Sequence, residues 1–310
     1  MKLLLAACLF ATVILPAQQA PQLKRPRITG VAHIALFVHD IEKSRAYYRD
    51  LLGYQEVFDL KNPDGSLSLT FVKINDRQYI ELFPEKAPAT DRLNHISIEV
   101  DDAEAMRAYL GSKGITVPEK VGKGRIKNSN FNVKDPDGHT VEIVQYEPDG
   151  WTIRDKGKAM DGPRISTRML HLGILVGALE PAMKFYRDIL GFEEIWRGSR
   201  DPKRLDWVNM KVPDGNDYIE FMLYDQIPAE TARGSQHHIC LEVADIDKSL
   251  ADLQQRPARE AYTRPMEIRT GINRKRQLNL FDPDGTRSEL MESKTVDGKP
   301  AISSQAPPPH

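Results

Sequence analysis

Histidine and glutamate recur along this 310-residue chain in an order that could bind metal ions. Each of four histidines stands in an alternating apolar run, and a glutamate in a similar run follows 47–51 residues later. The eight residues are His33, Glu81, His95 and Glu142 in the first half, and His171, Glu220, His238 and Glu289 in the second. Two imidazoles and two carboxylates suit Zn, Ni, Co, Mn or Fe and leave positions open for substrate. We therefore expect one or two divalent metal ions per chain.

Strand periodicity indicates how these side chains would meet. Glu81 lies within the apolar run 79–83, and side chains alternate between the two faces of a strand. Such a glutamate would point into a barrel or cleft, where an unpaired carboxylate is costly. A structural role for each histidine and a solvent-facing glutamate are the alternatives, but the repeated register favours metal sites. The remaining histidines, interpreted as surface or structural, are His39, His139, His237 and His310.

An internal repeat organises the chain. Residues 31–57 match residues 169–195 at a constant offset of 138, which aligns His33 with His171. Residues 93–102 match 236–245 and resemble the same opening strand. Four similar modules therefore start near residues 28, 92, 166 and 235.

Each module has the pattern of a βαβββ unit. An alternating strand is followed by a helical stretch, and then by three short strands joined by turns that contain Asp, Asn and Gly. Gly53 and Gly191 follow the helices of the first and third modules, where a left-handed cap is expected. The predicted class is α+β. The predicted parts are a signal peptide (1–20), a first domain (28–147, modules 28–90 and 92–147), a linker (148–165), a second domain (166–293, modules 166–228 and 235–293) and a disordered tail (294–310).

The amino-terminal residues have the pattern of a secretory signal. Lys2 precedes an apolar stretch over 3–15, and small and polar residues follow over 16–20. That stretch is too short to span a membrane. We expect a periplasmic or secreted protein without a stable membrane span after cleavage, with an uncleaved amino-terminal anchor as the alternative. The remaining cysteine, Cys240, is then expected to be a buried small hydrophobic residue.

The charge composition argues against some classes of binding partner. Lys and Arg number 43 and Asp and Glu number 44, so the net charge is −1. This balance argues against nucleic-acid binding and against a polybasic membrane surface. A small-molecule substrate is expected, with the protein a monomer or homodimer. Basic residues before the final strands of each half could receive an anionic substrate or form solvated loops; they are Arg125, Lys127, Arg274 and Lys275.

Two repeated motifs carry a resemblance to a known family. Residues 47–53 (YYRDLLG) match 185–191 (FYRDILG), and the pattern Asp-Pro-Asp-Gly-x-x-x-Glu recurs at 135–142 and 282–289. Over residues 28–150 and 166–293 the chain resembles the vicinal oxygen chelate superfamily, which includes glyoxalase I, extradiol dioxygenases, methylmalonyl-CoA epimerase, and the fosfomycin and bleomycin resistance proteins. The resemblance implies modules paired into two open, barrel-like mixed sheets. Modules one and two would pair with each other, as would three and four; exchange (one with four, two with three) is the alternative.

The resemblance also implies a site and a reaction. The four histidines and four glutamates named above match the family's ligand positions. Similarity to glyoxalase I and the epimerases implies a lyase or isomerase that chelates vicinal oxygens of its substrate, stabilises an enediolate and moves a proton through a metal-bound glutamate. Glu142 and Glu289 are the expected bases, with Glu81 and Glu220 as alternatives. A lactoylglutathione substrate is not expected, because the chain has an export signal and 127–130 lacks the family's Gly-Gly-Thr-Thr.

Two other functions remain open at this point. An Fe(II) extradiol dioxygenase would use His171, His238 and Glu289, but no histidine lies between His171 and His237, and Asn279 stands where such enzymes have a tyrosine. A non-enzymatic protein that binds an antibiotic or metabolite is the other alternative. Binding members of the family usually lack the metal ligands, whereas this chain keeps them all.

Overall fold

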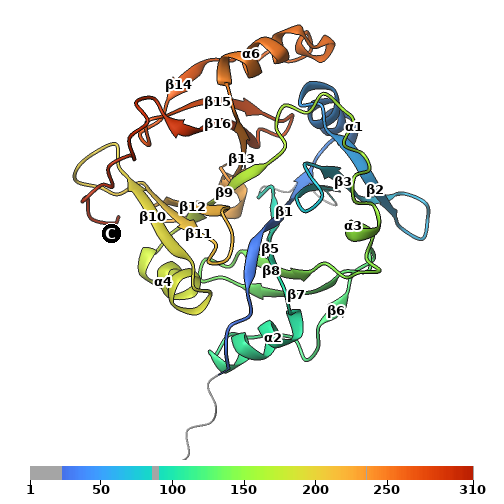
Figure 1. Cartoon of the computed structure of the whole chain (residues 1–310), viewed down its shortest axis with the longest axis vertical. Helices are drawn as coiled ribbons and strands as arrows, with labels where there is room; N and C mark the ends of the chain where they lie inside the picture. Colours follow the sequence, from blue (N-terminus) through green and yellow to red (C-terminus); the bar gives the residue numbers. More distant parts are fainter. Residues whose placement is uncertain (1–22, 86–90, 235, 310) are drawn as a thin grey trace, which may run out of the picture.

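Two eight-stranded mixed sheets dominate the computed structural model, which describes residues 23–85, 91–234 and 236–309 (Figure 1). The first sheet has the order β2-β3-β4-β1-β5-β8-β7-β6, and the second has the matching order β10-β11-β12-β9-β13-β16-β15-β14. The predicted signal peptide over 1–20 lies outside the described residues. Within those residues, no helix is long and apolar enough to cross a membrane.

The two halves contain the same strands in the same order. The first sheet comprises β1 (Ile28–Val38), β2 (Gln55–Lys61), β3 (Leu67–Lys73), β4 (Tyr79–Pro84), β5 (Leu93–Val100), β6 (Gly122–Lys123), β7 (Ser129–Lys134) and β8 (Thr140–Gln145). The second comprises β9 (Met169–Val176), β10 (Glu193–Gly198), β11 (Trp207–Lys211), β12 (Tyr218–Leu223), β13 (His238–Val243), β14 (Ile268–Thr270), β15 (Lys275–Phe281) and β16 (Arg287–Thr295). The helices are α1 (Ile41–Arg45), α2 (Ala103–Ser112), α3 (Trp151–Arg154), α4 (Leu179–Met183), α5 (Glu230–Arg233) and α6 (Ile246–Gln255).

Strand pairing settles which modules combine. β1 pairs with β4 of its own module in parallel and with β5 of the second module in antiparallel fashion. β9 likewise pairs with β12 and β13. Modules one and two therefore form one sheet and modules three and four the other, which confirms the α+β class and the barrel-like sheets and rules out the exchanged pairing. The opening strands, which carry the histidines, lie side by side at the centre of each sheet.

The helices that follow β1 and β9 end in wide turns. α1 and α4 continue into π-helical turns, η1 (Ala46–Leu51) and η2 (Lys184–Ile189). Gly53 and Gly191 follow with φ of 81° and 77°, so the predicted left-handed caps are present. At Gly53 a Cβ atom would lie 2.3 Å from the carbonyl oxygen of Pro163, so a side chain would also collide with the segment that joins the halves.

The two repeated motifs meet across the boundary between the halves. The Tyr48 hydroxyl, from the first half, donates to Asp282 Oδ2 over 3.1 Å. In the equivalent place, the Tyr186 hydroxyl donates to Asp135 Oδ2 over 3.0 Å. All four residues are buried. The tyrosine of one motif therefore binds the turn of the other motif in the opposite half, which fixes one sheet against the other.

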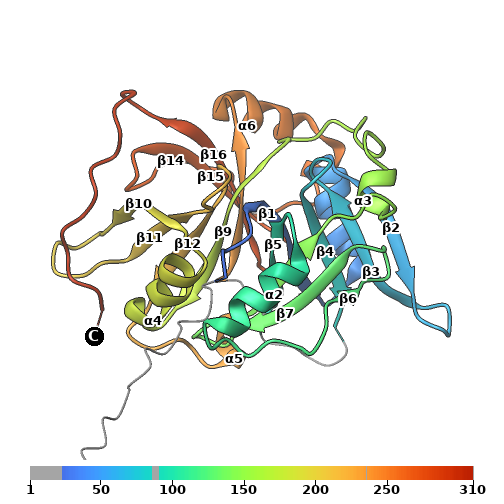
Figure 2. The same cartoon turned by 60° about the horizontal axis from the view of Figure 1, so that its bottom comes forward.

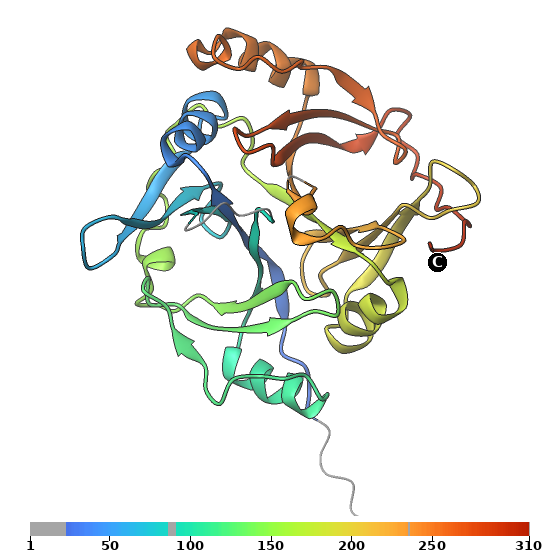
Figure 3. The same ribbon diagram turned by 180° about the vertical axis from the view of Figure 1, so that it is seen from behind.

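Helices reinforce this contact with the same approximate symmetry. α6 lies beside α1, where Arg256 donates to the carbonyl oxygen of Leu51 (Figures 1 and 3). On the other side, the Tyr109 hydroxyl of α2 donates over 2.7 Å to the carbonyl oxygen of Ile189, just beyond α4 (Figure 2). One continuous apolar core, which includes Ile34 and Leu172 of the two central strands, runs through both halves.

The connecting and final segments pack against the sheets. Within 148–165, the carbonyl oxygens of Asp155 and Lys158 accept hydrogen bonds from the fully buried Lys73 ammonium group. At the carboxyl end, Ser304 N donates to the carbonyl oxygen of Arg197 on β10. β16 extends to Thr295, and the residues after it satisfy backbone groups of the second half.

The tyrosine–aspartate contacts predict unequal losses of stability. Tyr48→Phe leaves Asp282 Oδ2 without a side-chain donor among the described residues, whereas after Tyr186→Phe the oxygen of Asp135 keeps His139 Nδ1 at 2.8 Å. We expect Tyr48→Phe to lower the free energy of unfolding by ~1–3 kcal/mol and Tyr186→Phe to lower it less. Urea unfolding of both variants measures this, and equal losses would contradict the asymmetry.

Candidate metal centres

The first sheet brings its four predicted ligands to one face. Ala35, in the middle of β1, is paired with Glu81 on one side and His95 on the other. Two residues earlier, His33 is paired with Ser97, which in turn is paired with Glu142. Directly paired residues, and residues two apart on one strand, share a face. The repeat thus places two histidines and two glutamates around the small side chain of Ala35.

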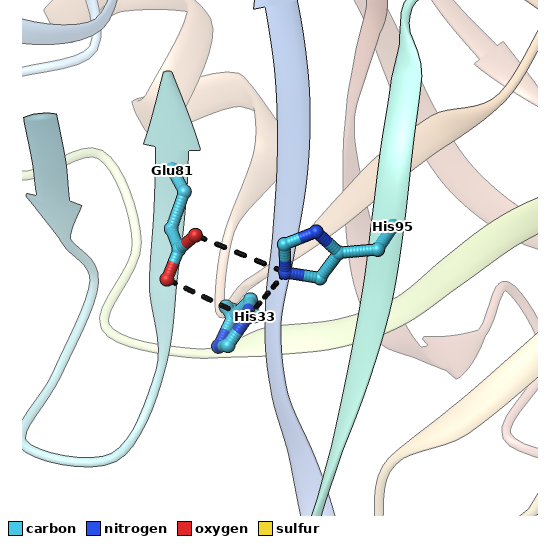
Figure 4. Close-up of side chains that lie close together, drawn as sticks. All are labelled: His33, Glu81 and His95. Atoms are coloured by element: carbon cyan, nitrogen blue, oxygen red, sulfur yellow. Dashed lines mark hydrogen bonds and ion pairs between the residues drawn. The ribbon is translucent and has the colours of Figure 1, made fainter. Parts of the chain in front are cut away.

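Their ligand atoms converge. His33 Nε2 lies 2.9 Å from Glu142 Oε2, 3.0 Å from His95 Nε2 and 3.5 Å from Glu81 Oε1. His95 Nε2 lies 3.8 Å from Glu81 Oε2, and Figure 4 shows both imidazoles and this carboxylate facing a common point. Ligands bound at about 2.1 Å to a tetrahedral cation stand about 3.4 Å apart. The first centre therefore fits a divalent cation.

Burial and mutual charge interactions shift the pKa values of the ligands in this cluster. Burial raises the pKa of Glu81 to about 7, against the opposing charge of His33. Burial alone would lower the pKa of His33, but the charges of Glu81 and Glu142 outweigh it and raise that pKa. The same interaction with His33 outweighs burial at Glu142 and holds the pKa of that carboxyl below its usual range. Two carboxylates thus depend on one imidazole for positive charge, and a divalent cation would supply it in place of protons.

Neighbouring polar groups orient the ligands. His95 Nδ1 lies 3.0 Å from Asn94 Oδ1, so the ring donates there and its Nε2 carries a lone pair, which faces His33 Nε2 at 3.0 Å and which a cation could take in place of the proton between them. Glu142 accepts from the Ser97 hydroxyl over 3.0 Å and from the Asn130 amide over 2.7 Å. Sequence reasoning missed these three residues. The sheet brings Ser97 and Asn130 to Glu142, and the contact of Asn94 with the ring of its chain neighbour His95 depends on side-chain conformation.

A cavity of about 180 Å³ opens onto the first centre. All four ligands line it. Its walls are largely aromatic and aliphatic, and include Leu60, Leu69, Phe71, Tyr79 and Phe83. Apolar walls around a few converging polar groups are typical of a small-molecule site.

The second sheet repeats the arrangement in outline. Gly173 takes the place of Ala35, paired with Glu220 and with His238. His238 Nε2 lies 3.1 Å from His171 Nε2 and 3.4 Å from Glu220 Oε1, and Glu289 Oε2 lies 3.6 Å from His171 Nε2. A Cβ atom on residue 173 would come within 1.8 Å of the His238 ring, so this ring occupies space that Ala35 fills in the first half.

In the second half, the guanidinium group of Arg287 opposes metal binding. An Nη2 hydrogen of Arg287 donates to His238 Nδ1 over 2.7 Å. Arginine has no acceptor, so Nδ1 must be the acceptor and the ring proton must lie on Nε2. Nε2–H is then directed at His171 Nε2, and the lone pair that a cation needs is engaged. Arg287 also places a positive charge beside Glu289. Ligand atoms of His171, Glu220 and His238 also lie within 4.8 Å of one another, but with Arg287 in this place His238 offers them no lone pair, so the second centre fits a divalent cation less well than the first.

The other predictions about individual residues have clear outcomes. Cys240 is fully buried, as predicted, and stands opposite Glu289 where the first half has Ser97. His39 is exposed and contacts Glu85. His139 and His237 are buried and stack edge to face, the former bonded to Asp135. His310 lies outside the described residues.

Arg287 is a residue that sequence reasoning missed but could have found. It stands two residues before Glu289, where the first half has Thr140.

Comparison with known proteins agrees with the fold and with the repeat. The family model described as Glyoxalase/Bleomycin resistance protein/Dioxygenase superfamily matches residues 30–143 and 168–290. A probable lactoylglutathione lyase of Vibrio parahaemolyticus is 32% identical over 124 residues, which are 37% of this chain and 89% of that protein.

Solved structures show the same fold at low sequence identity. The Mn(II)-bound glyoxalase from Novosphingobium aromaticivorans superposes with a TM-score of 0.66 at 16% identity, over 91% of this chain and 87% of that one. The 2,3-dioxygenase LapB from Pseudomonas sp. KL28 gives 0.66 at 17% identity, over 90% and 98% of the two chains. With the family model matched in both halves, the chain belongs to the Glyoxalase/Bleomycin resistance protein/Dioxygenase superfamily.

Proposed function

We propose that the first half is a metal-dependent lyase or isomerase that removes a proton from a carbon next to a carbonyl group of a small, oxygen-chelating substrate. The convergence of His33, Glu81, His95 and Glu142 on one cavity carries this proposal. A divalent cation held by these residues would polarise the substrate oxygens. Family relatives named as lactoylglutathione lyases support the reaction class.

Glu142 is the proposed base. Its carboxyl group has a pKa below the usual range, so it is ionised at neutral pH and free of a proton, although a low pKa also makes it a weaker base than a carboxylate that titrates near pH 7. Ser97 and Asn130 each donate to one of its oxygens, so it would keep both partners while it moves relative to a cation. Glu81 has a pKa near 7 in the cation-free cluster and is the alternative base.

The ring-cleaving alternative is less well supported. It would place Fe(II) on His171, His238 and Glu289, and Arg287 engages His238 there. Glu289, proposed from the sequence as a second base, adjoins the same arginine. We therefore assign the reaction to the first half, and a non-enzymatic binding role is an outcome of the test below.

Export of the protein remains part of the proposal. It rests on the pattern of residues 1–20, with a basic start, an apolar stretch and a small-residue end. Outside the cytoplasm, glutathione conjugates would be scarce, which favours a substrate without a thiol group.

The proposed base leads to a mutational prediction. Glu142→Gln keeps a metal-binding oxygen but cannot take a proton, so we expect at least a 100-fold loss of proton removal. Proton NMR in D2O measures this as deuterium uptake at the α-carbon of hydroxyacetone or dihydroxyacetone. Glu289→Gln is the matched control in the second half and should exchange at the wild-type rate. If Glu142→Gln exchanges normally while Glu81→Gln does not, the base is Glu81. Equal rates in wild type and every variant would favour a binding protein.

Metal binding should depend on pH in a defined direction. Glu81, with a pKa near 7, must lose its proton to bind a cation, so affinity should rise between pH 6 and pH 8 and then level off. Calorimetric titration of chelator-treated protein with Mn²⁺ or Zn²⁺ measures this. His33→Ala should abolish the high-affinity phase, whereas His171→Ala should preserve it. Affinity that falls with rising pH would contradict the assignment.

A further inference from the structure

The second half contains a cavity whose lining differs in chemistry from that of the first. It has a volume of about 450 Å³ and is bounded by strands of the second sheet and by residues 298–301 near the chain end. Its lining includes Trp196, Asn209, Tyr218, Asn273 and Lys275.

Comparison of equivalent positions shows what has changed. Asn209 is paired with Glu220 as Phe71 is paired with Glu81, so an amide replaces an aromatic ring. When the Asp-Pro-Asp-Gly motifs at 135 and 282 are aligned, Asn273 stands in the place of Ile126 and Lys275 in the place of Asn128. The first cavity is lined mainly by apolar side chains with one cation, Arg125, whereas the lining of the second includes three lysines, Lys275, Lys294 and Lys299.

Several polar groups at this cavity have no partner. The half-buried Lys275 ammonium group makes no hydrogen bond or ion pair within the described chain, whereas its neighbour Arg274 pairs with Asp297. Among the described residues, Trp196 Nε1 and Asn209 Oδ1 are also unpartnered, and their residues are 9% and 5% exposed. Unpartnered buried polar atoms cost stability, which a ligand would restore.

The histidine–glutamate cluster of the second half, which does not itself line this cavity, has an internal hydrogen-bonded series without a metal ion. Arg287, His238 and His171 form a hydrogen-bonded series in the place where the first half gathers its ligands. The charge of Arg287 acts on Glu289, and the charge of Lys275 acts on Glu220 and Glu289 without a hydrogen bond or ion pair to either. Tyr218 stacks on His171 with ring centres 4.5 Å apart and presents an aromatic wall to the cavity.

From these observations we propose that the second half is a metal-independent binding site for a small organic anion. Lys275 receives the carboxylate, the rings of Trp196 and Tyr218 contact the body of the molecule, and the Asn209 carbonyl oxygen accepts from a hydroxyl or amino group if the ligand carries one. Proton removal at the first centre is not needed for this binding.

Calorimetry with benzoate on the full chain tests the site. Benzoate should bind with equal affinity to metal-loaded and chelator-treated protein, and benzamide, which lacks the charge, should bind at least about 10-fold more weakly. Lys275→Met should weaken benzoate binding by a similar factor, and Lys275→Gln should repeat the effect. Arg274→Met is the matched control, because the removed cation is adjacent but ion-paired elsewhere, and it should bind like wild type.

Three results would overturn the proposal. They are the absence of saturable benzoate binding, an unchanged affinity in both Lys275 variants, and loss of binding in His33→Ala. The last would assign the anion to the first centre, whereas failure of the proposed reaction would leave benzoate binding in place.

Metal content tests the other half of the proposal. Elemental analysis should give one equivalent per wild-type chain. Arg287→Thr introduces the residue found at the corresponding place in the first half, frees His238 and should raise the content toward two. Two equivalents in the wild type, one of them retained in His33→Ala, would show that the second centre binds metal after all.

Discussion

Two carboxylates buried on the inner face of a sheet need positive charge beside them, and the halves of this protein meet that need differently. In the first half, Glu81 and Glu142 share one imidazole, so the cluster retains a strong demand for a cation. In the second half, Arg287 and Lys275 stand beside the equivalent carboxylates. The same geometry is therefore suited to a divalent cation in one place and stable without it in the other.

Strands β1 and β9 bring the two carboxylates of each half close together. Ala35 and Gly173 hold the middle of each ring of ligands, because a larger side chain would fill the space between them. Because Gly173 has no side chain, the His238 ring lies directly against this strand, where Arg287 donates a hydrogen bond to it. One missing methyl group and one added guanidinium group thus distinguish two sites built from the same repeat.

The same repeat also joins the halves. Tyr48 binds the turn at Asp282, and Tyr186 binds the turn at Asp135, so each half completes the buried hydrogen bonds of the other. Because the core is continuous across this boundary, the two sites belong to one folded unit, and a ligand in the second could influence the stability of the first.

The amino-acid sequence alone determined the modules, the α+β class and the eight candidate ligands, because periodicity and a constant offset of 138 are local properties that a repeat displays directly. Even the left-handed glycines, Gly53 and Gly191, were predictable from their place after a helix. Tertiary structure decided the pairing of modules, the orientation of each imidazole and the separate characters of the two centres. These depend on contacts that only the folded chain forms: Arg287 of β16 meets His238 of β13 across strands, and the Asn94 side chain reaches Nδ1 of the neighbouring His95 on the same strand. A hydrogen bond to the far nitrogen of a ring selects its tautomer, and no spacing along the chain encodes that contact.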